Sequence, residues 1–229
     1  MISVIVPTYN ERNNILDLIR QIEEVFSGAA VPDFEIIVMD DDSPDGTASL
    51  VLESGDSRVR VVNRKDKVRG LSAAVIDGFK EATGDIIGVM DADLSHPPVL
   101  LPRLVGAVRE GYNLAVGSRY VPGGGIRDWP FKRVLVSKVA CWLARPVTSV
   151  KDPTSGFFFL KRAILENVPL NPLGFKIGLE VFVKSRHENK IKEVPYVFTD
   201  RKKGVSKFNL QIIVCYLQQL FYLATRPRK

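Results

Sequence analysis

The stretch ISVIVPTYNERNNILDLIRQIEEVFSGAAVPDFEIIVMDDDSPDGTASLVL, residues 2–52, repeats one pattern: an apolar run, a polar turn and a helical segment. The β-branched runs at 2–6 and 34–39 predict strands, and segments 11–26 and 47–52 predict helices. A strand, a helix and a second strand in this order form a right-handed crossover between parallel strands. The stretch therefore predicts a parallel sheet covered by helices.

The same alternation continues through the first half of the chain. It predicts further strands at 59–62, 85–90 and 114–117, with helices at 71–82 and 98–110. The expected fold class is α/β, with a mostly parallel central sheet and helices on both faces. In such sheets ligands bind beyond the carboxyl ends of the strands.

The second half departs from this rhythm after Arg119. A stretch rich in proline and glycine at 122–125 precedes a predicted amphipathic helix at 131–144. Two more strands are predicted at 156–160 and 191–198. Because no linker is long enough to separate two domains, we assign residues 1–207 to one catalytic domain.

A final amphipathic helix is predicted over residues 208–224, and segment 208–229 adds a basic tail. The helix is too short and too polar on one side to span a bilayer comfortably. Its apolar face has two possible explanations, burial against the sheet or contact with a membrane surface. The second is favoured, because residues 201–229 carry seven basic side chains and no acidic one.

Composition sets broad limits on the function. With 45% hydrophobic and 25% charged residues among 229, the chain is an ordinary globular protein. Cys141 and Cys215 lack metal-ligand spacing, and no secretory signal follows Met1, so we expect the cytoplasmic side of a membrane. The net charge of +6 is too mild to choose among nucleic acid, phosphorylated substrate and anionic membrane.

Two carboxylates, Asp91 and Asp93, follow the predicted strand at 85–90. Mg²⁺ or Mn²⁺ usually takes one or two protein carboxylates and fills its other positions with water and phosphate oxygens. The pair therefore suits a metal-bound nucleoside diphosphate. Without the strand context, a solvated turn with Ser95 as a helix N-cap explains the same residues.

A second acidic group, Asp40 to Asp42, follows the strand predicted at 34–39. Three adjacent carboxylates repel one another, a cost that is easier to understand if one of them binds ribose hydroxyls or a base. The alternative is a turn in which Asp45 or Thr47 caps the next helix, and both explanations can hold together. The chain lacks the glycine-rich motifs of dinucleotide reductases and P-loop NTPases.

Seven motifs follow one another along nearly the whole chain: VPTYNE at 6–11, DDDSPDGT at 40–47, RGLS at 69–72, DADLSHP at 91–97, GSRY at 117–120, DPTSG at 152–156 and GVSK at 204–207. With these motifs the sequence resembles the family 2 glycosyltransferases of the GT-A fold. Within that family it is most similar to the group that transfers mannose to dolichyl phosphate. Seven motifs in the same order are far more specific to one family than any single motif is.

The resemblance implies roles for particular residues. The nucleoside is expected at Pro7, Tyr9, Glu11, Met39 and Asp41. The metal is expected at Asp91 and Asp93, with Ser95 as a weaker third ligand. Catalysis is expected at Asp91, Asp93, Arg119, Arg201 and Lys207, and these five residues also bind the nucleotide sugar together with Ala92. The acceptor phosphate is expected at Arg119, Arg133 and Ser137.

The implied reaction is inverting transfer of mannose from GDP-mannose to dolichyl (polyprenyl) phosphate, with Mg²⁺ or Mn²⁺. A phosphate monoester has a second pKa near 6, so it is already a nucleophilic anion and needs cations rather than a strong base. The lipid acceptor implies a membrane surface, with the helices at 131–144 and 208–224 as interfacial anchors and further membrane subunits as possible partners. For the first helix, burial against the sheet is an equal alternative.

Three other functions compete with this interpretation. Another polyprenyl-phosphate glycosyltransferase, for example one that uses UDP-glucose, remains open because the sugar pocket is not legible in the sequence. A nucleotide-binding subunit without catalysis is disfavoured by the intact Asp91, Asp93, Arg201 and Lys207. Binding to nucleic acid ranks last, because the chain shows no recognition motif for it.

Two aromatic features are less specific. His96 follows the carboxylate pair, but its proline neighbours favour a packing or capping role over catalysis. Trp129 and Phe131 stand beside the glycines at 123–125, where they fit either a mobile acceptor loop or ordinary loop packing.

Overall fold

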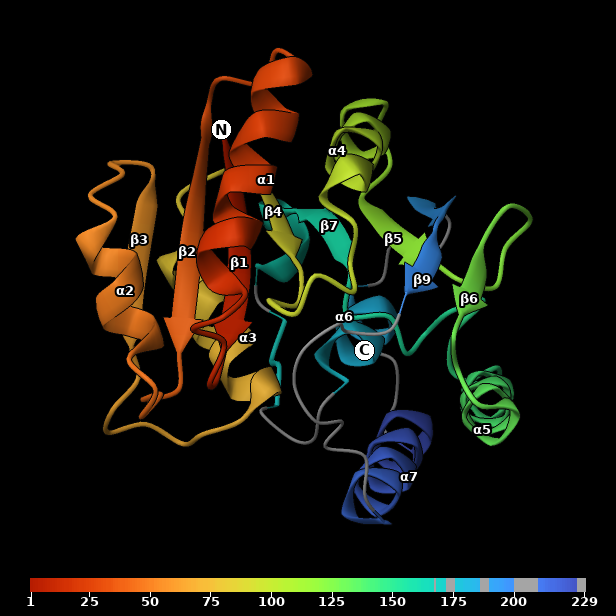
Figure 1. Cartoon of the computed structure of the whole chain (residues 1–229). Helices are drawn as coiled ribbons and strands as arrows, with labels where there is room; N and C mark the ends of the chain where they lie inside the picture. Colours follow the sequence, from red (N-terminus) through yellow and green to blue (C-terminus); the bar gives the residue numbers. More distant parts are fainter. Residues whose placement is uncertain (167, 172–175, 186–189, 200–209, 226–229) are drawn as a thin grey trace.

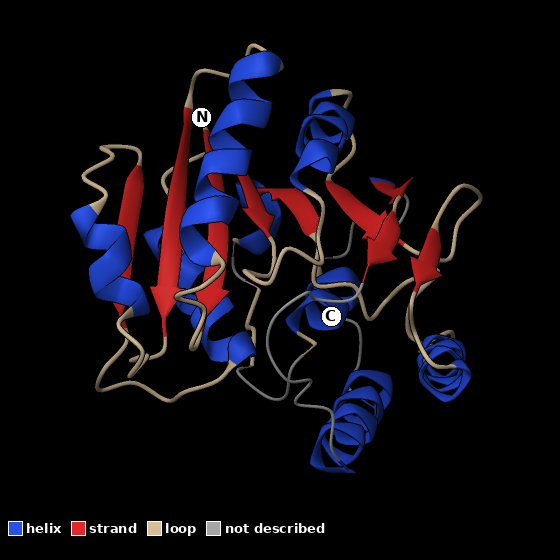
Figure 2. Ribbon diagram, viewed as in Figure 1, coloured by secondary structure: helices blue, strands red, loops and turns tan. Residues whose placement is uncertain are grey.

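A computed structural model describes residues 1–166, 168–171, 176–185, 190–199 and 210–225, and its centre is a seven-stranded sheet (Figures 1 and 2). The strands lie in the order β3-β2-β1-β4-β7-β5-β8. Their bounds are β1 Ile2–Thr8, β2 Phe34–Asp40, β3 Val59–Asn63, β4 Ile86–Val89, β5 Leu114–Ser118, β7 Phe158–Lys161 and β8 Ile191–Pro195.

The sheet is mostly parallel, as predicted. β1 pairs in parallel with both β2 and β4, β2 with β3, and β5 with β8. Among the described strands of this sheet, β7 alone runs the other way, and it pairs antiparallel with β4 and β5. The predicted strand at 156–160 is therefore present, from Phe158 to Lys161, with reversed direction.

Helices cover both faces of the sheet (Figure 1). One face packs against α1 Ile15–Gly28, α2 Thr47–Glu53 and α4 Leu101–Arg109, and the other against α3 Leu71–Glu81 and α6 Ile177–Lys184. Side chains of a strand alternate between the faces, so Val4 and Val6 join the first cluster and Ile5 joins the second. All three are fully buried, which contributes about 1.5–3 kcal/mol for each side chain.

The remaining elements stand beside the sheet. They are the single-turn helices η1 Pro98–Leu100 and η2 Arg162–Leu165, the paired strands β6 Gly125–Arg127 and β9 Val197–Thr199, and the helices α5 Phe131–Leu143 and α7 Leu210–Thr225. In Figure 1, α5 and α7 occupy the same end of the molecule, away from α1 and α4. Among the described residues, no helix is long and apolar enough to cross a membrane.

Helix α7 answers the question that its sequence left open, because its apolar residues divide between two surroundings. Tyr216, Leu220 and Leu223 are buried in a cluster with residues of α6, and the Tyr216 hydroxyl donates to the carbonyl oxygen of Ala140 at 2.7 Å. Other apolar side chains of the same helix are exposed: Val214, Leu217 and Phe221. The helix is thus attached to the protein and still presents an apolar stripe outward.

Three elements differ from the predictions. The strand predicted at 191–198 is two strands in two sheets, because β8 ends at Pro195 and β9 pairs with β6. The helix predicted from residue 11 begins at Ile15, since the Asn14 amide first turns back to the Glu11 carbonyl oxygen at 2.9 Å. Helix α6 was not predicted, because its short apolar run fits a buried strand equally well.

Gly88 provides a test of the β4–β7 packing. A Cβ atom at this position would lie 2.1 Å from the ring of Phe159, its partner in the register. We expect Gly88→Ala to lower the free energy of unfolding by about 1–3 kcal/mol, as overpacking does. Urea unfolding followed by circular dichroism measures the change.

Gly106→Ala is the matched control for this substitution. Gly106 lies within α4, and a Cβ atom there meets nothing within 4 Å. Because alanine favours the helix, this variant should gain about 0.5–1 kcal/mol. Equal stability of the two variants would contradict the packing described for Gly88.

Candidate active site

The predicted site residues gather at the carboxyl edge of the sheet. β1 lies between β2 and β4, and all three run in parallel, so their ends meet at one edge. Asp40 ends β2, and Asp91 follows shortly after β4. The two acidic groups predicted from sequence therefore flank the end of β1.

The outer two carboxylates of the triple-aspartate segment are satisfied within the protein. Asp40 is buried and accepts hydrogen bonds from the Thr8 hydroxyl at 2.8 Å and from the Ser43 amide and hydroxyl at 2.8 and 2.6 Å. Asp42 forms an exposed ion pair with Arg69 at 2.9 Å. Hydrogen bonds and a cation therefore offset much of the repulsion among the three adjacent carboxylates.

Asp41, expected at the nucleoside, is held by a buried arginine. Its Oδ1 accepts from Arg64 Nη1, and its Oδ2 accepts from the Gly70 amide at 2.7 Å. Arg64 is 1% exposed and also contacts Asp77 at 3.2 Å. The orientation of Asp41 is thus fixed by contacts of both carboxylate oxygens within the protein.

The other residues expected at the nucleoside lie beside Asp41 in different ways. Pro7 and Met39 are partners in the β1–β2 register, but the Met39 side chain is completely buried in the core. The part of Met39 that could meet a nucleoside is therefore its main chain, at the end of β2. Tyr9 is 37% exposed with Arg69 over its ring, and the Glu11 amide donates to Thr47 Oγ1 at 3.1 Å.

The carboxylate pair after β4 forms a short, ordered turn. Asp93 Oδ1 accepts from the Ser95 amide at 3.1 Å and from its hydroxyl at 2.6 Å, and Ser95 is buried. The Ser95 hydroxyl, expected as a weak metal ligand, thus points to Asp93 and orients it. Ala92, between the two carboxylates, is buried in the core beneath them.

The pair fits a nucleotide-bound divalent cation. Among the described residues no three His, Cys, Asp or Glu side chains gather into a larger cluster. Two carboxylates leave coordination positions for phosphate oxygens and water, which is how Mg²⁺ is commonly bound together with nucleotides. Asp91, with 37% of its side chain exposed, faces a pocket.

His96 supports Asp91, in agreement with the packing role predicted for it. The ring stacks on Phe157 with centroids 4.8 Å apart, and Nδ1 accepts a hydrogen bond from the Asp91 amide at 3.0 Å. Burial lowers the pKa of His96, so the ring is neutral and its proton is assigned to Nε2, 3.8 Å from Asp91 Oδ2. His96 thereby holds the main chain of Asp91 and lies beside its carboxylate.

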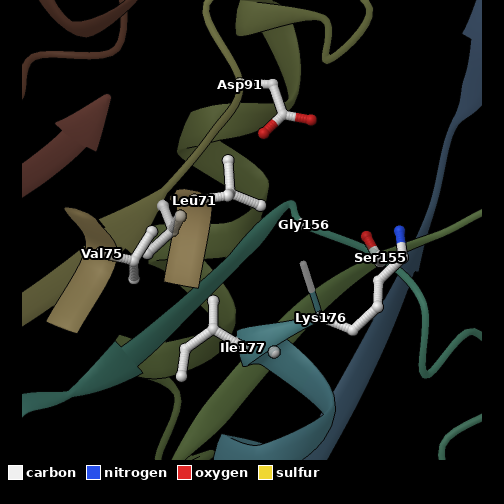
Figure 3. Close-up of a pocket in the computed structure, with 9 residues that line it drawn as sticks. Leu71, Val75, Asp91, Ser155, Gly156, Lys176 and Ile177 are labelled. Carbon is white, nitrogen blue, oxygen red and sulfur yellow. The ribbon is translucent and has the colours of Figure 1, made fainter. Parts of the chain in front are cut away.

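Lys176 belongs to the same pocket and was missed in the sequence. Figure 3 shows Asp91 and Lys176 on different sides of the pocket, with apolar side chains of Leu71, Val75 and Ile177 along the rest of its wall. Lys176 Nζ donates to the Thr154 carbonyl oxygen at 3.0 Å. Burial lowers the pKa of this lysine. The pocket therefore combines a carboxylate, an ammonium group and an apolar wall.

Arg119 is buried against a single acidic partner, Asp152. Its Nε and Nη2 donate to the two carboxylate oxygens, both at 2.7 Å, and its amide donates to Oδ2 at 3.0 Å. Burial alone raises the pKa of Asp152, but the bonds from Arg119 outweigh it and hold the pKa below its ordinary value. The guanidinium of Arg119 is 8% exposed and has Thr154 Oγ1 at 2.8 Å. The pair fixes Arg119 rigidly.

Arg133 and Ser137, expected at the acceptor phosphate, come close to Arg119 through aromatic residues. The Tyr120 hydroxyl donates to Ser137 Oγ at 2.7 Å, and Arg119 Cζ lies 5.4 Å from the Tyr120 ring. Arg133 Cζ lies 3.9 Å from the centre of the Trp129 ring. The structure thus brings together the three residues that the resemblance assigns to one phosphate. Arg201 and Lys207 lie outside the described residues.

Three residues of this site had no signal in the sequence: Arg64, Asp152 as an ion-pair partner, and Lys176. Asp152 was quoted only as part of a motif, and Arg64 stands in a charged loop that resembles any solvated segment. Their partners lie 23 and 33 positions away in the chain, so pairing depends on the tertiary fold. A buried position for Arg64 could not be inferred from its polar neighbours.

Comparison with known proteins agrees with this geometry. The family described as "Glycosyl transferase family 2" matches residues 3–172. A dolichol-phosphate mannosyltransferase of Pyrococcus furiosus is 45% identical over 97% of this chain, and the chain spans 63% of the length of that relative. A dolichol-phosphate mannosyltransferase of Saccharomyces cerevisiae is 41% identical over 95% of this chain and 85% of its own.

A solved structure shows the same architecture. Glucosyl-3-phosphoglycerate synthase from Mycobacterium tuberculosis, in complex with Mn²⁺, UDP and glucosyl-3-phosphoglycerate, matches with a TM-score of 0.70 and 27% identity. The match covers 97% of this chain and 78% of that one. The predicted α/β fold of GT-A type is therefore confirmed.

The Arg119–Asp152 pair gives a stability prediction with a definite pH dependence. Asp152→Asn should lower the free energy of unfolding at pH 7 by about 3–5 kcal/mol, because it leaves a buried guanidinium without its counter-charge. The folded-state pKa of Asp152 is below its ordinary value of 3.8, so the pair contributes above about pH 4 and its contribution is lost as the pH falls through that lower pKa. Urea unfolding between pH 3 and pH 7 measures both effects.

Asp17→Asn is the control, because it removes an exposed carboxylate that pairs with Arg20 on α1. This change should stay within about 0.5 kcal/mol of the wild type at every pH. If the gap between Asp152→Asn and the wild type did not narrow below pH 4, the buried pair would not be the source of the stability.

Proposed function

The chain belongs to glycosyltransferase family 2, and on that premise we propose that it transfers mannose, with inversion, from GDP-mannose to dolichyl or another polyprenyl phosphate. The observation that carries the proposal is the placement of a carboxylate pair, Asp91 and Asp93, opposite a cluster of cations at one edge of the sheet. The names of the relatives at 41–45% identity supply the sugar and the acceptor class. The two sides of the site match the two charged substrates.

The donor side is built on the ends of β1, β2 and β4. Asp41, fixed by Arg64, faces the nucleoside together with Pro7 and Tyr9. Asp91 and Asp93 would hold Mg²⁺ or Mn²⁺ between themselves and the diphosphate. Such a cation supplies positive charge that stabilises the departing GDP. The Mn²⁺ in the complex of the mycobacterial synthase supports a divalent metal here.

We propose that the sugar of the donor lies at the opening between Asp91 and Lys176. The partly desolvated ammonium of Lys176 suits hydrogen bonds to sugar hydroxyls or to the diphosphate. Leu71, Val75 and Ile177 form an apolar wall there, which suits the carbon face of a hexose ring.

The acceptor side consists of Arg119, Arg133 and Ser137. Two anionic substrates repel each other, so cations must neutralise the incoming phosphate before it can approach a diphosphate. The phosphate monoester is ionised at neutral pH and attacks the anomeric carbon as one of its oxygens forms the new bond and the bond to GDP breaks. No general base is required, and the phosphate keeps no proton that must be removed. Arg201 and Lys207 remain predictions for the diphosphate.

A membrane surface is the proposed source of the acceptor. On α5 the exposed apolar side chains Phe131, Leu135, Val139 and Trp142 recur every three or four residues and form one stripe. Val214, Leu217 and Phe221 form a second stripe on α7. The described helices contact each other through Tyr216 and Ala140, so both stripes belong to one end of the molecule (Figure 1).

Charge supports a lipid surface as the occupant of these stripes. Helix α5 carries Lys132, Arg133 and Lys138 and no acidic residue. Helix α7 has no charged residue between Leu210 and Thr225. A basic and apolar face of this kind binds at the boundary of lipid headgroups and acyl chains. We therefore propose peripheral attachment at the cytoplasmic face, with the chain segment 208–229 as part of the attachment. The same face is also the proposed contact for membrane subunits.

Transfer from a panel of labelled nucleotide sugars to detergent-solubilised dolichyl phosphate tests the function. GDP-mannose should be used above all others, and the activity should disappear with EDTA and return with Mg²⁺ or Mn²⁺. Asp91→Asn and Asp93→Asn should each lower turnover by at least about 10²-fold, the size of effect for a lost charge-stabilising group, with unchanged melting temperatures.

Glu110→Gln, an exposed change at the end of α4, is the matched control and should retain full turnover. Preference for UDP-glucose would replace the mannose assignment with the alternative glucosyltransferase. Full activity of both aspartate variants would remove the carboxylate pair from the site.

The membrane proposal predicts a difference between two double variants. Trp142→Gln with Phe221→Gln should weaken binding to phosphatidylcholine/phosphatidylserine vesicles by at least about tenfold, since each aromatic side chain contributes about 1.5–3 kcal/mol when it leaves water. Leu52→Gln with Val99→Gln changes two side chains that are 67% and 72% exposed elsewhere, and should leave binding unchanged. Sedimentation with vesicles measures both.

Salt separates the two contributions to this binding. Raising the ionic strength should weaken the wild-type interaction without abolishing it, because salt screens the charges but not the apolar contact. A wild-type protein that ignores vesicles at every salt concentration, or equal losses in the two double variants, would show that the stripes do not contact lipid.

A further inference from the structure

Trp129 occupies a position that the reaction described above does not explain. It follows β6 by two residues and stands between the two arginines of the acceptor side. Arg133 Cζ lies 3.9 Å from the centre of its ring and Arg119 Cζ lies 5.6 Å from it. An aromatic face attracts guanidinium groups through its quadrupole, and tryptophan does so most strongly.

We infer that Trp129 is a positioning residue, whose indole ring holds the Arg133 guanidinium beside Arg119 so that both can bind one phosphate of the acceptor. The inference rests on the proposed function, since it presumes a phosphate between these arginines. Asp152 already neutralises much of the charge of Arg119, which lets a second guanidinium approach it. A ring that contacts both guanidinium groups adds attraction to each and keeps them side by side.

The ring itself is fixed by its surroundings. Its edge-to-face contact with Phe198 of β9 has centroids 5.1 Å apart at an angle of 70°. Phe198 is buried and is the register partner of Ile126 in β6, so the small β6–β9 sheet carries the indole. The neighbouring Asp128 has a φ of 61°, a left-handed conformation that turns the chain sharply before Trp129.

The two arginines differ in what holds them. Arg119 is locked by its two bonds to buried Asp152. Arg133 is half-buried in the first turn of α5, and its guanidinium has close contact with the indole. Trp129 is therefore one group that places a residue of the outer helix α5 against the edge of the sheet. Loss of the ring removes that contact from the Arg133 guanidinium.

The indole N–H of Trp129 indicates a site to which a bound ligand or a loop adds a hydrogen-bond acceptor. Trp129 Nε1 is buried, and no acceptor for it is found among the described residues. An unpaired buried donor is costly, so this group is expected to gain an acceptor when the acceptor phosphate is bound. This observation does not depend on the distances to the arginines.

The test uses farnesyl phosphate and farnesol as probes, with binding to the full chain measured by calorimetry. Trp129→Leu should weaken farnesyl phosphate binding by about tenfold, the effect of one desolvated cation–π contact, and Trp129→Phe by less. Binding of farnesol and of GDP-mannose should not change. In the transfer assay the acceptor KM should rise while the donor KM stays constant.

A double-mutant cycle asks whether Trp129 acts through Arg133. In the Arg133→Gln background, Arg119 and Ser137 still hold the phosphate, and Trp129→Leu should then have little further effect. A tenfold loss in both backgrounds would show that Trp129 acts independently of Arg133 and would overturn the inference. So would unchanged binding by Trp129→Leu in the wild-type background.

Two controls keep the result interpretable. Tyr112→Leu removes another ring under a cation, Lys192 at 5.2 Å, at the opposite end of β5, and should leave farnesyl phosphate binding unchanged. If Trp129→Leu does not fold, Trp129→Phe, which keeps a ring against Phe198, decides the question with its smaller loss, and no loss in it overturns the inference. If the wild type binds farnesyl phosphate no better than farnesol, no phosphate site exists and the inference is wrong. If farnesyl phosphate binds as expected but the protein transfers no sugar from the panel of nucleotide sugars, only the proposed sugar transfer is contradicted.

Discussion

Strand β1 is the constraint on which the rest of the structure depends. Its residues are buried throughout, and it pairs in parallel with β2 on one side and β4 on the other. A strand in this position places apolar side chains on both faces, and its two polar side chains, Ser3 and Thr8, are buried and donate to carboxylates of β2. Its parallel pairing also aligns the ends of its two neighbours. The two acidic turns that follow its neighbours are thereby brought to one edge. The chemistry of the chain is concentrated there because the interior of the sheet excludes it.

The charges at this edge are arranged so that some are neutralised and others remain available. Asp41 and Asp152 are each paired with a buried arginine, and these pairs give fixed walls. Asp91 instead lies beside a neutral histidine and faces the pocket, so its negative charge is available to attract a cation. Each buried pair fixes the geometry of its two side chains, because removing one partner would leave the other charge buried and unpaired. The site therefore separates the residues that position from those that bind.

The proposed donor and acceptor sides of the site differ in the elements that hold their residues. Donor residues stand on the ends of strands in the central sheet, where hydrogen bonds fix the backbone. Acceptor residues Arg133 and Ser137 belong to α5, which stands beside the sheet and exposes an apolar stripe. Aromatic residues connect α5 to the segment after β5: Tyr120 contacts Ser137, and Trp129 contacts both Arg119 and Arg133. The same helix that the proposal attaches to lipid thus reaches the phosphate site, which suits an acceptor that cannot leave the membrane.

The sequence by itself determined the alternation of strands and helices, the mostly parallel sheet and the acidic turns at its edge, because these features follow from side-chain periodicity over a few residues. Only the tertiary structure decided which charges meet. Arg119 and Asp152 are 33 positions apart, and nothing local marks them as partners. It also placed the Met39 side chain in the core, reversed β7, and divided the apolar residues of α7 between the protein and the surface. These outcomes depend on contacts between segments that are far apart in the sequence. Such contacts form only when the whole chain packs.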